Sequence, residues 1–372
     1  MKKTAAALVG ACMLVAACAS PAPVSKPSST MAPAFNWERV SPKDAGFDTK
    51  KLNEVFAETD ALKSACLVVV KDGKLVVEKY WRGEDPEKPR VAFSVTKSVV
   101  STLVGIAQDD GDLRIIDRAS QYIPEWNGTD SETVTVRNLL ANDSGRKWDP
   151  KTDYSGLFSA DNMSEYAVGL GQMAPPGKVW AYNNSAIQTL DRILIEATGR
   201  RPYEIARDRI FEPLGMSNSR ISSDSSGQST GMSAGMLTTC MDLARFGLMI
   251  EQGGVWQGQR IVSEEWIADA TGRASQKLNA AYGYLWWLNR AGDVRGPLDD
   301  GSSAPPVVQA RRQLVPGGPK DMFSAMGFGG QIVLIDPASR TVVVRMGDPN
   351  VDGQLSRYDI PDAARVVTYA LK

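Results

Sequence analysis

Apolar positions run together near both ends of the chain and recur with helical spacing between them. Apolar runs at 65–70 and 75–81 flank Asp72 and Gly73, which predicts a β-hairpin with a tight turn. Further strands are predicted at 282–288, 331–335 and 341–346, followed by a closing helix at 361–371.

The centre of the chain has mostly helical periodicity. Strands at both ends must therefore join in one sheet, which predicts an α+β fold in which helices flank an antiparallel sheet. We expect one domain over 37–372, with a mostly helical lobe inserted at about 100–275. The predicted helices are 94–108, 136–140, 185–198, 203–211 and 241–252.

The N-terminus resembles a bacterial export signal. Lys2 and Lys3 precede an apolar stretch that ends at Cys18 in a lipobox-like sequence. We expect a signal peptide at 1–17, lipidation of Cys18 and a Pro/Ser-rich tether at 18–36. This predicts a lipid-anchored protein on the periplasmic side of the envelope, with no other membrane contact; cleavage near Ala19, giving a free periplasmic protein, is the alternative.

Composition excludes several kinds of chemistry. The 372 residues contain no histidine, so a Ser-His-Asp triad, a Cys-His pair and the usual histidine-containing zinc site are impossible. A formal net charge of −1 gives no reason to expect nucleic-acid binding. Cys66 and Cys240 could pair or remain buried thiols, and the apolar run around Cys66 favours the thiol.

A Ser-x-x-Lys sequence offers a base that is not histidine. Ser94 and Lys97 lie one turn apart on an apolar predicted helix, where burial would lower the lysine pKa. The helix N-terminus favours an oxyanion at Ser94. The alternative is a capping serine with a surface lysine. A second match, Ser144 and Lys147, lacks helical geometry because Pro150 follows.

One further serine has the spacing of a nucleophile elbow. Ser233 lies in a Gly-x-Ser-x-Gly sequence at 231–235, but that motif needs a preceding strand and a histidine. No strand is predicted there and the chain has no histidine. We interpret 231–235 as a glycine-rich loop.

Two more segments carry candidate site residues. Tyr182 and Asn184 form the only Tyr-x-Asn sequence of the chain, in which the phenol can relay a proton and the amide can hold a carbonyl or a lysine. Phe328, Gly329 and Gly330 precede a predicted strand that begins at Gln331. Taken alone, a half-buried tyrosine beside a turn and a glycine bulge would explain both segments.

The order of these segments resembles that of the serine β-lactamase and penicillin-binding-protein superfamily, most closely the branch with class C β-lactamases, esterases and 6-aminohexanoate-dimer hydrolases. The resemblance covers about 42–371 and implies that Ser94 is acylated while Lys97 and Tyr182 transfer protons. It also implies that Asn184 contacts substrate and lysine, and that the N–H groups of Ser94 and Gln331 form the oxyanion hole. Supporting runs are 93–98, 135–140, 211–216, 242–247 and 282–287.

The third motif departs from this family. Relatives commonly have Lys-Thr-Gly or His-x-Gly where this chain has Phe328, Gly329 and Gly330. Loss of a charge-assisted contact to a carboxylate would weaken binding by about 1.5–3 kcal/mol. An aromatic side chain at the mouth favours a neutral acyl group, unless Arg311, Arg312 or Lys320 supplies a cation.

We therefore expect a serine hydrolase that acts on small esters or amides through an acyl-enzyme and needs no metal or organic cofactor. A β-lactamase or DD-peptidase is the alternative enzyme, and a non-catalytic envelope lipoprotein of the same fold is the alternative outside enzymes. The acyl group, the leaving group and the oligomeric state are not readable from the sequence.

Overall fold

The computed structural model describes residues 35–272, 277–299, 312–351 and 353–372. The predicted signal peptide and Cys18 lie outside the described residues, as does the tether except for its last two residues. Among the described residues, no helix has the length and apolar character needed to cross a bilayer.

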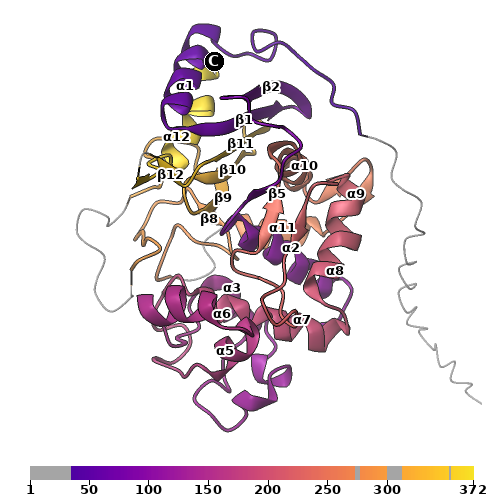
Figure 1. The fold of residues 1–372 in the computed structure, drawn as a ribbon, viewed down its shortest axis with the longest axis vertical. Helices are drawn as coiled ribbons and strands as arrows, with labels where there is room; N and C mark the ends of the chain where they lie inside the picture. The colour runs from indigo at the N-terminus through magenta and orange to yellow at the C-terminus, as the bar shows by residue number, and fades with distance from the viewer. Residues whose placement is uncertain (1–34, 273–276, 300–311, 352) are drawn as a thin grey trace, which may run out of the picture. The chain divides into compact units, whose positions relative to one another are not determined.

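A six-stranded antiparallel sheet joins the two ends of the chain, as the sequence predicts (Figure 1). The strand order is β2-β1-β11-β10-β9-β8, so the N-terminal hairpin pairs with the C-terminal strands through β1 and β11. The hairpin turn has positive φ at Asp72 and Gly73, which explains the Asp-Gly sequence. The strands of this sheet are β1 (Ser64–Lys71), β2 (Lys74–Tyr80), β8 (Trp287–Leu288), β9 (Phe323–Gly327), β10 (Gln331–Asp336) and β11 (Thr341–Gly347).

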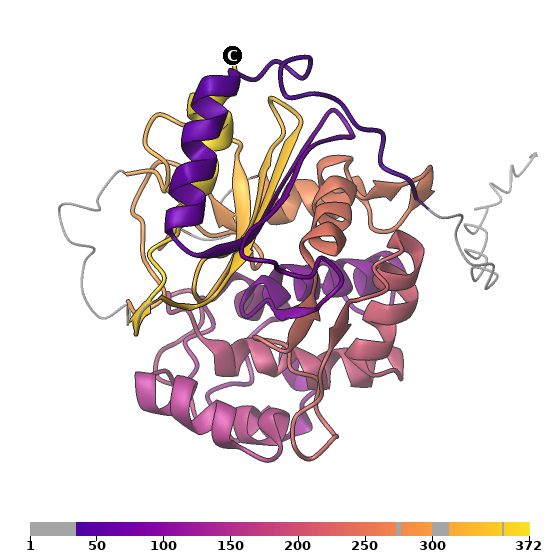
Figure 2. The same ribbon diagram turned by 45° about the horizontal axis from the view of Figure 1, so that its top comes forward.

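Helices cover both faces of the sheet, because its central strands are apolar on both sides. The helix α1 (Thr49–Ala61) lies with the C-terminal helix on one face, and α10 (Cys240–Glu251) lies on the other (Figure 2). Gly247 permits close packing of α10, since an added Cβ would approach the Val342 and Val333 side chains to 2.6 and 3.1 Å.

The remaining elements belong mostly to the chain between β2 and β8. The short strands are β3 (Arg90–Val91), β4 (Arg220–Ile221), β5 (Met236–Thr238), β6 (Val255–Trp256), β7 (Gln259–Arg260), β12 (Asn350–Val351) and β13 (Gln354–Leu355). The other α-helices are α2 (Val95–Asp109), α3 (Val136–Ala141), α4 (Leu157–Ser159), α5 (Met163–Gly169), α6 (Asn184–Gln188), α7 (Leu190–Thr198), α8 (Pro202–Ala206), α9 (Glu212–Leu214), α11 (Glu264–Thr271) and α12 (Ile360–Arg365). Two 3₁₀ turns (Ala119–Gln121 and Pro124–Trp126) and three π-helical segments (Lys151–Gly156, Arg207–Phe211 and Val366–Ala370) complete the set.

Several sequence predictions need correction. The single helix predicted at 185–198 is two helices, α6 and α7, which meet at Thr189. Most of the strand predicted at 282–288 is a turn, because Leu285 has a φ of +63° and only Trp287 and Leu288 join the sheet. Among the elements we did not predict, α1 and β9 matter most, since α1 covers the sheet and β9 borders the site.

Of the two alternatives for Cys66 and Cys240, the structure has the pair and not the buried thiol that the apolar run favoured. Cys66 of β1 and Cys240 at the start of α10 form a disulfide with Cα atoms 6.6 Å apart. Both residues are buried, so the bond joins the sheet to the helix that covers it. The apolar sequence around Cys66 indicated burial correctly, but it could not reveal which side chain lies opposite.

Candidate active site

Ser94 lies at the N-terminus of α2 with its hydroxyl available for chemistry. The side chain makes no capping hydrogen bond, although it occupies the capping position. Phe93 has a φ of +48°, an uncommon conformation for a residue with a side chain, and it turns the chain sharply before the helix. All residues from Val95 to Ala107 are buried, so α2 is a rigid core element beneath Ser94.

Lys97 is buried in this helix and points at Ser94. Its side-chain nitrogen lies 2.8 Å from Ser94 Oγ, 2.7 Å from Asn184 Oδ1 and 2.7 Å from the carbonyl oxygen of Ser233. Only 1% of the residue is exposed. The geometry matches the one-turn relationship predicted from the Ser-x-x-Lys spacing.

Burial changes the protonation of Lys97. Loss of hydration disfavours the ammonium and lowers the lysine pKa from 10.5 to about 7, while the nearby charge of Asp153 acts in the opposite direction. A substantial fraction of Lys97 is therefore neutral at pH 7, and a neutral amine can accept a proton.

The glycine-rich loop around Ser233 contributes to the site through its backbone. The carbonyl oxygen of Ser233 accepts a hydrogen bond from Lys97, while the hydroxyl of Ser233 is buried without a partner among the described residues. Gly231 and Gly235 lie so close together that a Cβ on Gly231 would be 3.0 Å from the Gly235 Cα. The Gly-x-Ser-x-Gly spacing concerns the Ser233 hydroxyl, but the Ser233 carbonyl oxygen is the group that contacts Lys97.

Tyr182 lies between Lys97 and a group of aromatic side chains. The Lys97 nitrogen lies 4.8 Å from the centroid of the Tyr182 ring, and Trp287 stacks on the ring at 5.6 Å. Burial raises the pKa of Tyr182, although a hydrogen bond with the Ser94 side chain opposes this rise. The phenol is therefore protonated at neutral pH and can donate a proton. Trp148 Nε1 donates to the Tyr182 carbonyl oxygen at 3.0 Å and fixes the backbone there.

Trp286 and Trp287 pack against different side chains, and only Trp287 belongs to β8. Trp286 packs on Phe246 and Phe323 in the core, with ring centroids 6.2 and 5.3 Å apart. Trp287 supports Tyr182 and is itself 3% exposed, so it lies behind the site and does not line an open acyl pocket.

Asn184 is held by a residue that the sequence analysis missed. Asp153 Oδ2 accepts hydrogen bonds from the Asn184 Nδ2 at 2.7 Å and from the Asn184 backbone at 3.0 Å. Tyr154 also contacts Asn184, and burial raises the pKa of Tyr154 to about 12. A single aspartate in a polar segment carries no recognisable spacing, so only the fold brings Asp153 to the site.

The glycine-rich turn after β9 lies beside the backbone of Ser94. A Cβ added to Gly327 would lie 3.2 Å from Ser94 N and would clash with the Ala92 carbonyl oxygen. Phe328 is 57% exposed, and its ring contacts that of Phe93 with centroids 5.6 Å apart. Phe328 therefore contacts the residue that precedes Ser94 in the chain.

Gln331 begins β10, inside the sheet. Its side-chain amide donates to the Gly347 carbonyl oxygen at 3.0 Å and accepts from the Gly347 nitrogen at 3.0 Å. This side chain links β10 to β11. Gln331 pairs with Gly327, which lies between the Gln331 side chain and Ser94.

A buried arginine braces the same turn. Arg345 Nη1 donates to the carbonyl oxygens of Gly329 and Gly330 at 2.8 and 3.0 Å, and Nε donates to Ser64 Oγ at 2.7 Å. Gly329 and Gly330 both have positive φ, near +75°. Their glycine identity thus serves a strained turn that wraps around the guanidinium of Arg345.

Three cations were considered for the mouth of the site, and the structure describes two of them. Arg312 and Lys320 are exposed, and Arg311 lies outside the described residues. Within the described ranges, no group of three residues with metal-ligating side chains is found.

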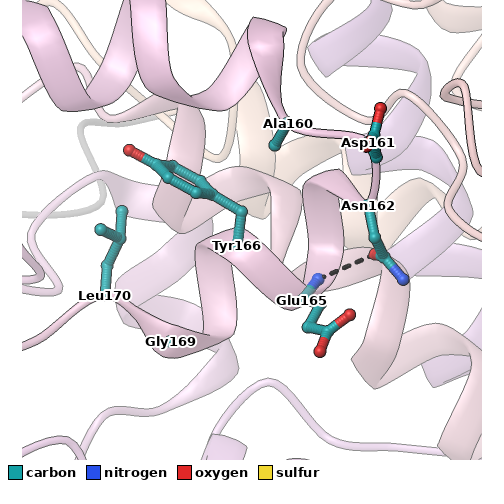
Figure 3. Close-up of a pocket in the computed structure, with 7 residues that line it drawn as sticks. All are labelled: Ala160, Asp161, Asn162, Glu165, Tyr166, Gly169 and Leu170. Atoms are coloured by element: carbon teal, nitrogen blue, oxygen red, sulfur yellow. Dashed lines mark hydrogen bonds between the residues drawn. The ribbon is translucent and has the colours of Figure 1, made fainter.

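An open hollow of 510 Å³ lies elsewhere, over α5 in the helical region (Figure 3). None of the predicted site residues lines it. Tyr166 lines the hollow and donates a hydrogen bond to the Thr152 carbonyl oxygen at 3.0 Å, so it contacts the segment that carries Asp153. The hollow is lined by Ala160, Asp161, Asn162, Glu165, Tyr166, Gly169 and Leu170.

Comparisons with known proteins agree with this geometry. The family model for beta-lactamase matches residues 52–366, so the chain belongs to the beta-lactamase family and is an enzyme of its serine hydrolase type. The 6-aminohexanoate-dimer hydrolase of Paenarthrobacter ureafaciens is 23% identical over 297 residues, which cover 75% of this chain and 71% of the relative.

Solved structures show the same fold. A Bacillus anthracis protein described as a 6-aminohexanoate-dimer hydrolase superposes with a TM-score of 0.68 at 20% identity, over 87% of this chain and 84% of its own. A family VIII carboxylesterase superposes with a TM-score of 0.62 at 17% identity, over 86% and 95%. The predicted fold class is thereby confirmed.

Proposed function

We propose that this enzyme hydrolyses small esters or amides through an acyl-enzyme on Ser94, with Lys97 as the base and Tyr182 as the acid. The observation that carries the proposal is the set of contacts around the Lys97 nitrogen. The Asn184 Oδ1 and the Ser233 carbonyl oxygen can only accept hydrogen bonds. In a neutral lysine they occupy both N–H groups, so the lone pair faces the Ser94 hydroxyl.

In the acylation step, Lys97 takes the Ser94 proton while Oγ attacks the substrate carbonyl carbon. Tyr182 donates its proton to the leaving group, because its raised pKa keeps the phenol protonated. The proton on Lys97 then passes to Tyr182 through a water, because Ser94 Oγ is now an ester oxygen. Water hydrolyses the acyl-enzyme by the reverse sequence and regenerates Ser94.

The oxyanion forms next to Ser94 N, the first expected donor. For the second donor we had predicted Gln331 N–H, but the contacts favour Phe328 N–H. The carbonyl oxygen of Gly327 accepts from Gly330 N at 3.1 Å, within the turn. In a trans peptide the N–H points the opposite way from the carbonyl, so Phe328 N–H leaves the turn on its other side. Gly327, in the same peptide, lies against Ser94 N.

The surroundings favour an uncharged acyl group. Phe328 and Phe93 flank Ser94 with aromatic rings. Lys97 is fully buried and makes its three contacts within the protein. A substrate carboxylate would therefore lose water without gaining a charged partner. This argues for neutral esters and amides, and the ester class agrees with the name of the carboxylesterase neighbour.

Labelling of the purified protein with a fluorophosphonate probe tests the proposal. We expect rapid labelling of the wild type and none of Ser94→Ala. Ser233→Ala, which removes the hydroxyl of the Gly-x-Ser-x-Gly sequence and keeps the backbone carbonyl, should be labelled as rapidly as the wild type. Persistent labelling of Ser94→Ala would overturn the assignment. A wild type that is neither labelled nor active on p-nitrophenyl esters would favour a non-catalytic lipoprotein.

The alternative enzyme is a β-lactamase or DD-peptidase, a reading favoured by the family model itself. Comparison of kcat/KM for a chromogenic cephalosporin with that for p-nitrophenyl acetate and butyrate separates the two. We expect the esters to be the better substrates.

We also propose that the protein is exported and anchored to a membrane through lipid on Cys18. The buried disulfide supports export, because such bonds form in oxidising compartments. Incorporation of radiolabelled palmitate that is lost in Cys18→Ala tests the anchor. An unlabelled wild type in the periplasmic fraction would favour the free protein.

A further inference from the structure

A buried carboxylate lies behind the Lys97–Asn184 pair, and its role in the reaction rests on the proposed function. Asp153 belongs to the π-helical segment Lys151–Gly156 and has no exposed surface. Its oxygens accept three hydrogen bonds: two from Asn184 at 2.7 and 3.0 Å, and one from Ser185 N at 2.7 Å. Among the described residues, no arginine or lysine forms an ion pair with it.

We propose that Asp153 is a positioning residue that orients Asn184 toward Lys97 and supports the protonated form of the lysine during catalysis. The hydrogen bonds form one chain, from the carboxylate to Asn184 Nδ2 and from Asn184 Oδ1 to the Lys97 nitrogen. An amide can rotate and exchange its oxygen and nitrogen. Because the Asp153 carboxylate accepts only from donors, Nδ2 must face it and Oδ1 must face Lys97.

All three contacts favour an ionised Asp153. A protonated carboxyl needs an acceptor for its O–H, whereas the three hydrogen bonds at 2.7 to 3.0 Å come from two N–H groups of Asn184 and the backbone N–H of Ser185. Burial raises the pKa of Asp153, whereas these hydrogen bonds lower it. We infer a carboxylate that is stabilised by donors and whose charge acts on Lys97 through Asn184.

The charge matters because the lysine alternates between two states. Lys97 becomes an ammonium each time it takes the Ser94 proton, and a buried ammonium is costly without a nearby anion. The other titratable groups of this network, Tyr182 beside the lysine and Tyr154 beside Asn184, have raised pKa values and remain neutral. Asp153 is therefore the group among them that can compensate the charge.

This role makes a prediction for the pH profile that a purely structural role does not make. Asp153→Asn removes the negative charge, so the Lys97 pKa falls and the acidic limb of kcat/KM moves to lower pH. We expect a shift of about one unit. The plateau of kcat should fall by about tenfold to a hundredfold, because Asn184 loses its orientation.

Asp191→Asn is the matched control. Asp191 is also a buried aspartate, and it accepts hydrogen bonds from Ser164 Oγ at 2.7 Å and Thr230 N at 3.0 Å. Its partners are not part of the Lys97 network. We expect a comparable loss of thermal stability but an unshifted acidic limb.

The experiment measures p-nitrophenyl butyrate hydrolysis and fluorophosphonate labelling of Ser94 from pH 5 to pH 9 in the three proteins, with thermal melts to establish folding. Should Asp153→Asn not fold, Asp153→Ser removes the charge with a smaller side chain. A folded variant with the wild-type midpoint, or an equal shift in Asp191→Asn, would overturn the role of Asp153. Failure of the proposed function is distinguishable, because the wild type itself would then be unlabelled and inactive.

Discussion

The indole ring of Trp287 stacks on the phenol ring of Tyr182, with centroids 5.6 Å apart and planes inclined by 24°. Trp180 and Tyr282 lie edge-on to the same pair at 4.9 to 6.4 Å. The tyrosine proposed as the acid is thus fixed by packing on β8, and the Lys97 nitrogen lies 4.8 Å from the centroid of its ring.

Trp287→Leu should lower kcat by about tenfold or more, because Tyr182 gains freedom to move from its productive position. KM should change little. Trp286→Leu is the control, since it removes an equally buried ring that packs on Phe246 and Phe323. Both variants should lose about 2–4 kcal/mol of unfolding free energy in urea. Equal kcat values for the two variants would contradict a specific role for Trp287.

The pH dependence of the wild type should follow Lys97. Only the neutral amine accepts the Ser94 proton, so kcat/KM rises with pH and reaches half its plateau near pH 7, where the lowered pKa lies. Because burial raises the Tyr182 pKa above its ordinary value of 10.0, no alkaline fall below pH 10 is expected from that group. Rates of p-nitrophenyl butyrate hydrolysis at constant ionic strength check both limbs. A midpoint near pH 10 would mean that the lysine is not desolvated.

Removal of a single N–H tests the oxyanion hole. Phe328→Pro lacks the backbone donor, whereas Phe328→Ala retains it and removes the ring. We expect Phe328→Pro to have a kcat about 10²- to 10³-fold below that of Phe328→Ala. Rates of p-nitrophenyl acetate hydrolysis give kcat for both variants, and circular dichroism shows that both are folded. Equal kcat values for Phe328→Pro and Phe328→Ala would favour Gln331 N–H as the second oxyanion donor.

Gly327→Ala approaches the same site from the other side. The added methyl group would lie 3.2 Å from Ser94 N and clash with the Ala92 carbonyl oxygen. Per folded molecule, Gly327→Ala should therefore lose more fluorophosphonate labelling than Gly329→Ala. The methyl group added at Gly329 would clash with Pro349, which is not part of the proposed site. Thermal melts establish how much of each variant is folded.

The disulfide should contribute to stability more than to catalysis. It links residues 174 positions apart, and a bond that closes so long a loop restricts the unfolded chain strongly. We expect the double variant Cys66→Ala, Cys240→Ala to lose about 2–5 kcal/mol of unfolding free energy. Urea unfolding with and without reductant measures the loss. Reductant should destabilise the wild type and leave the double variant unchanged.

Part of the site was visible in the sequence because its chemistry depends on local spacing. Ser94 and Lys97 share a helix face whenever the helix forms, and the absence of histidine left few other bases. Tyr182 and Asn184 were found through their order along the chain. The structure brings these four residues together.

Other contributors had no local signal. Ser233 acts through a backbone carbonyl, which every residue possesses, and Gly327 acts through the absence of a side chain. Trp287 and Trp286 are neighbours in the sequence, and only their packing partners in the fold, Tyr182 and Phe246, distinguish them.

The sequence by itself determined the hairpin, the helix that carries Ser94 and Lys97, the sheet formed from both chain ends and the exclusion of histidine chemistry. These features depend on periodicity, composition and spacings of a few residues. The tertiary structure alone decided that Cys66 bonds to Cys240, that the Ser233 carbonyl meets Lys97 and that Asp153 stands behind Asn184. Such contacts join segments from 31 to 174 residues apart. Burial, which gives Lys97 its low pKa, arises only when those segments pack together.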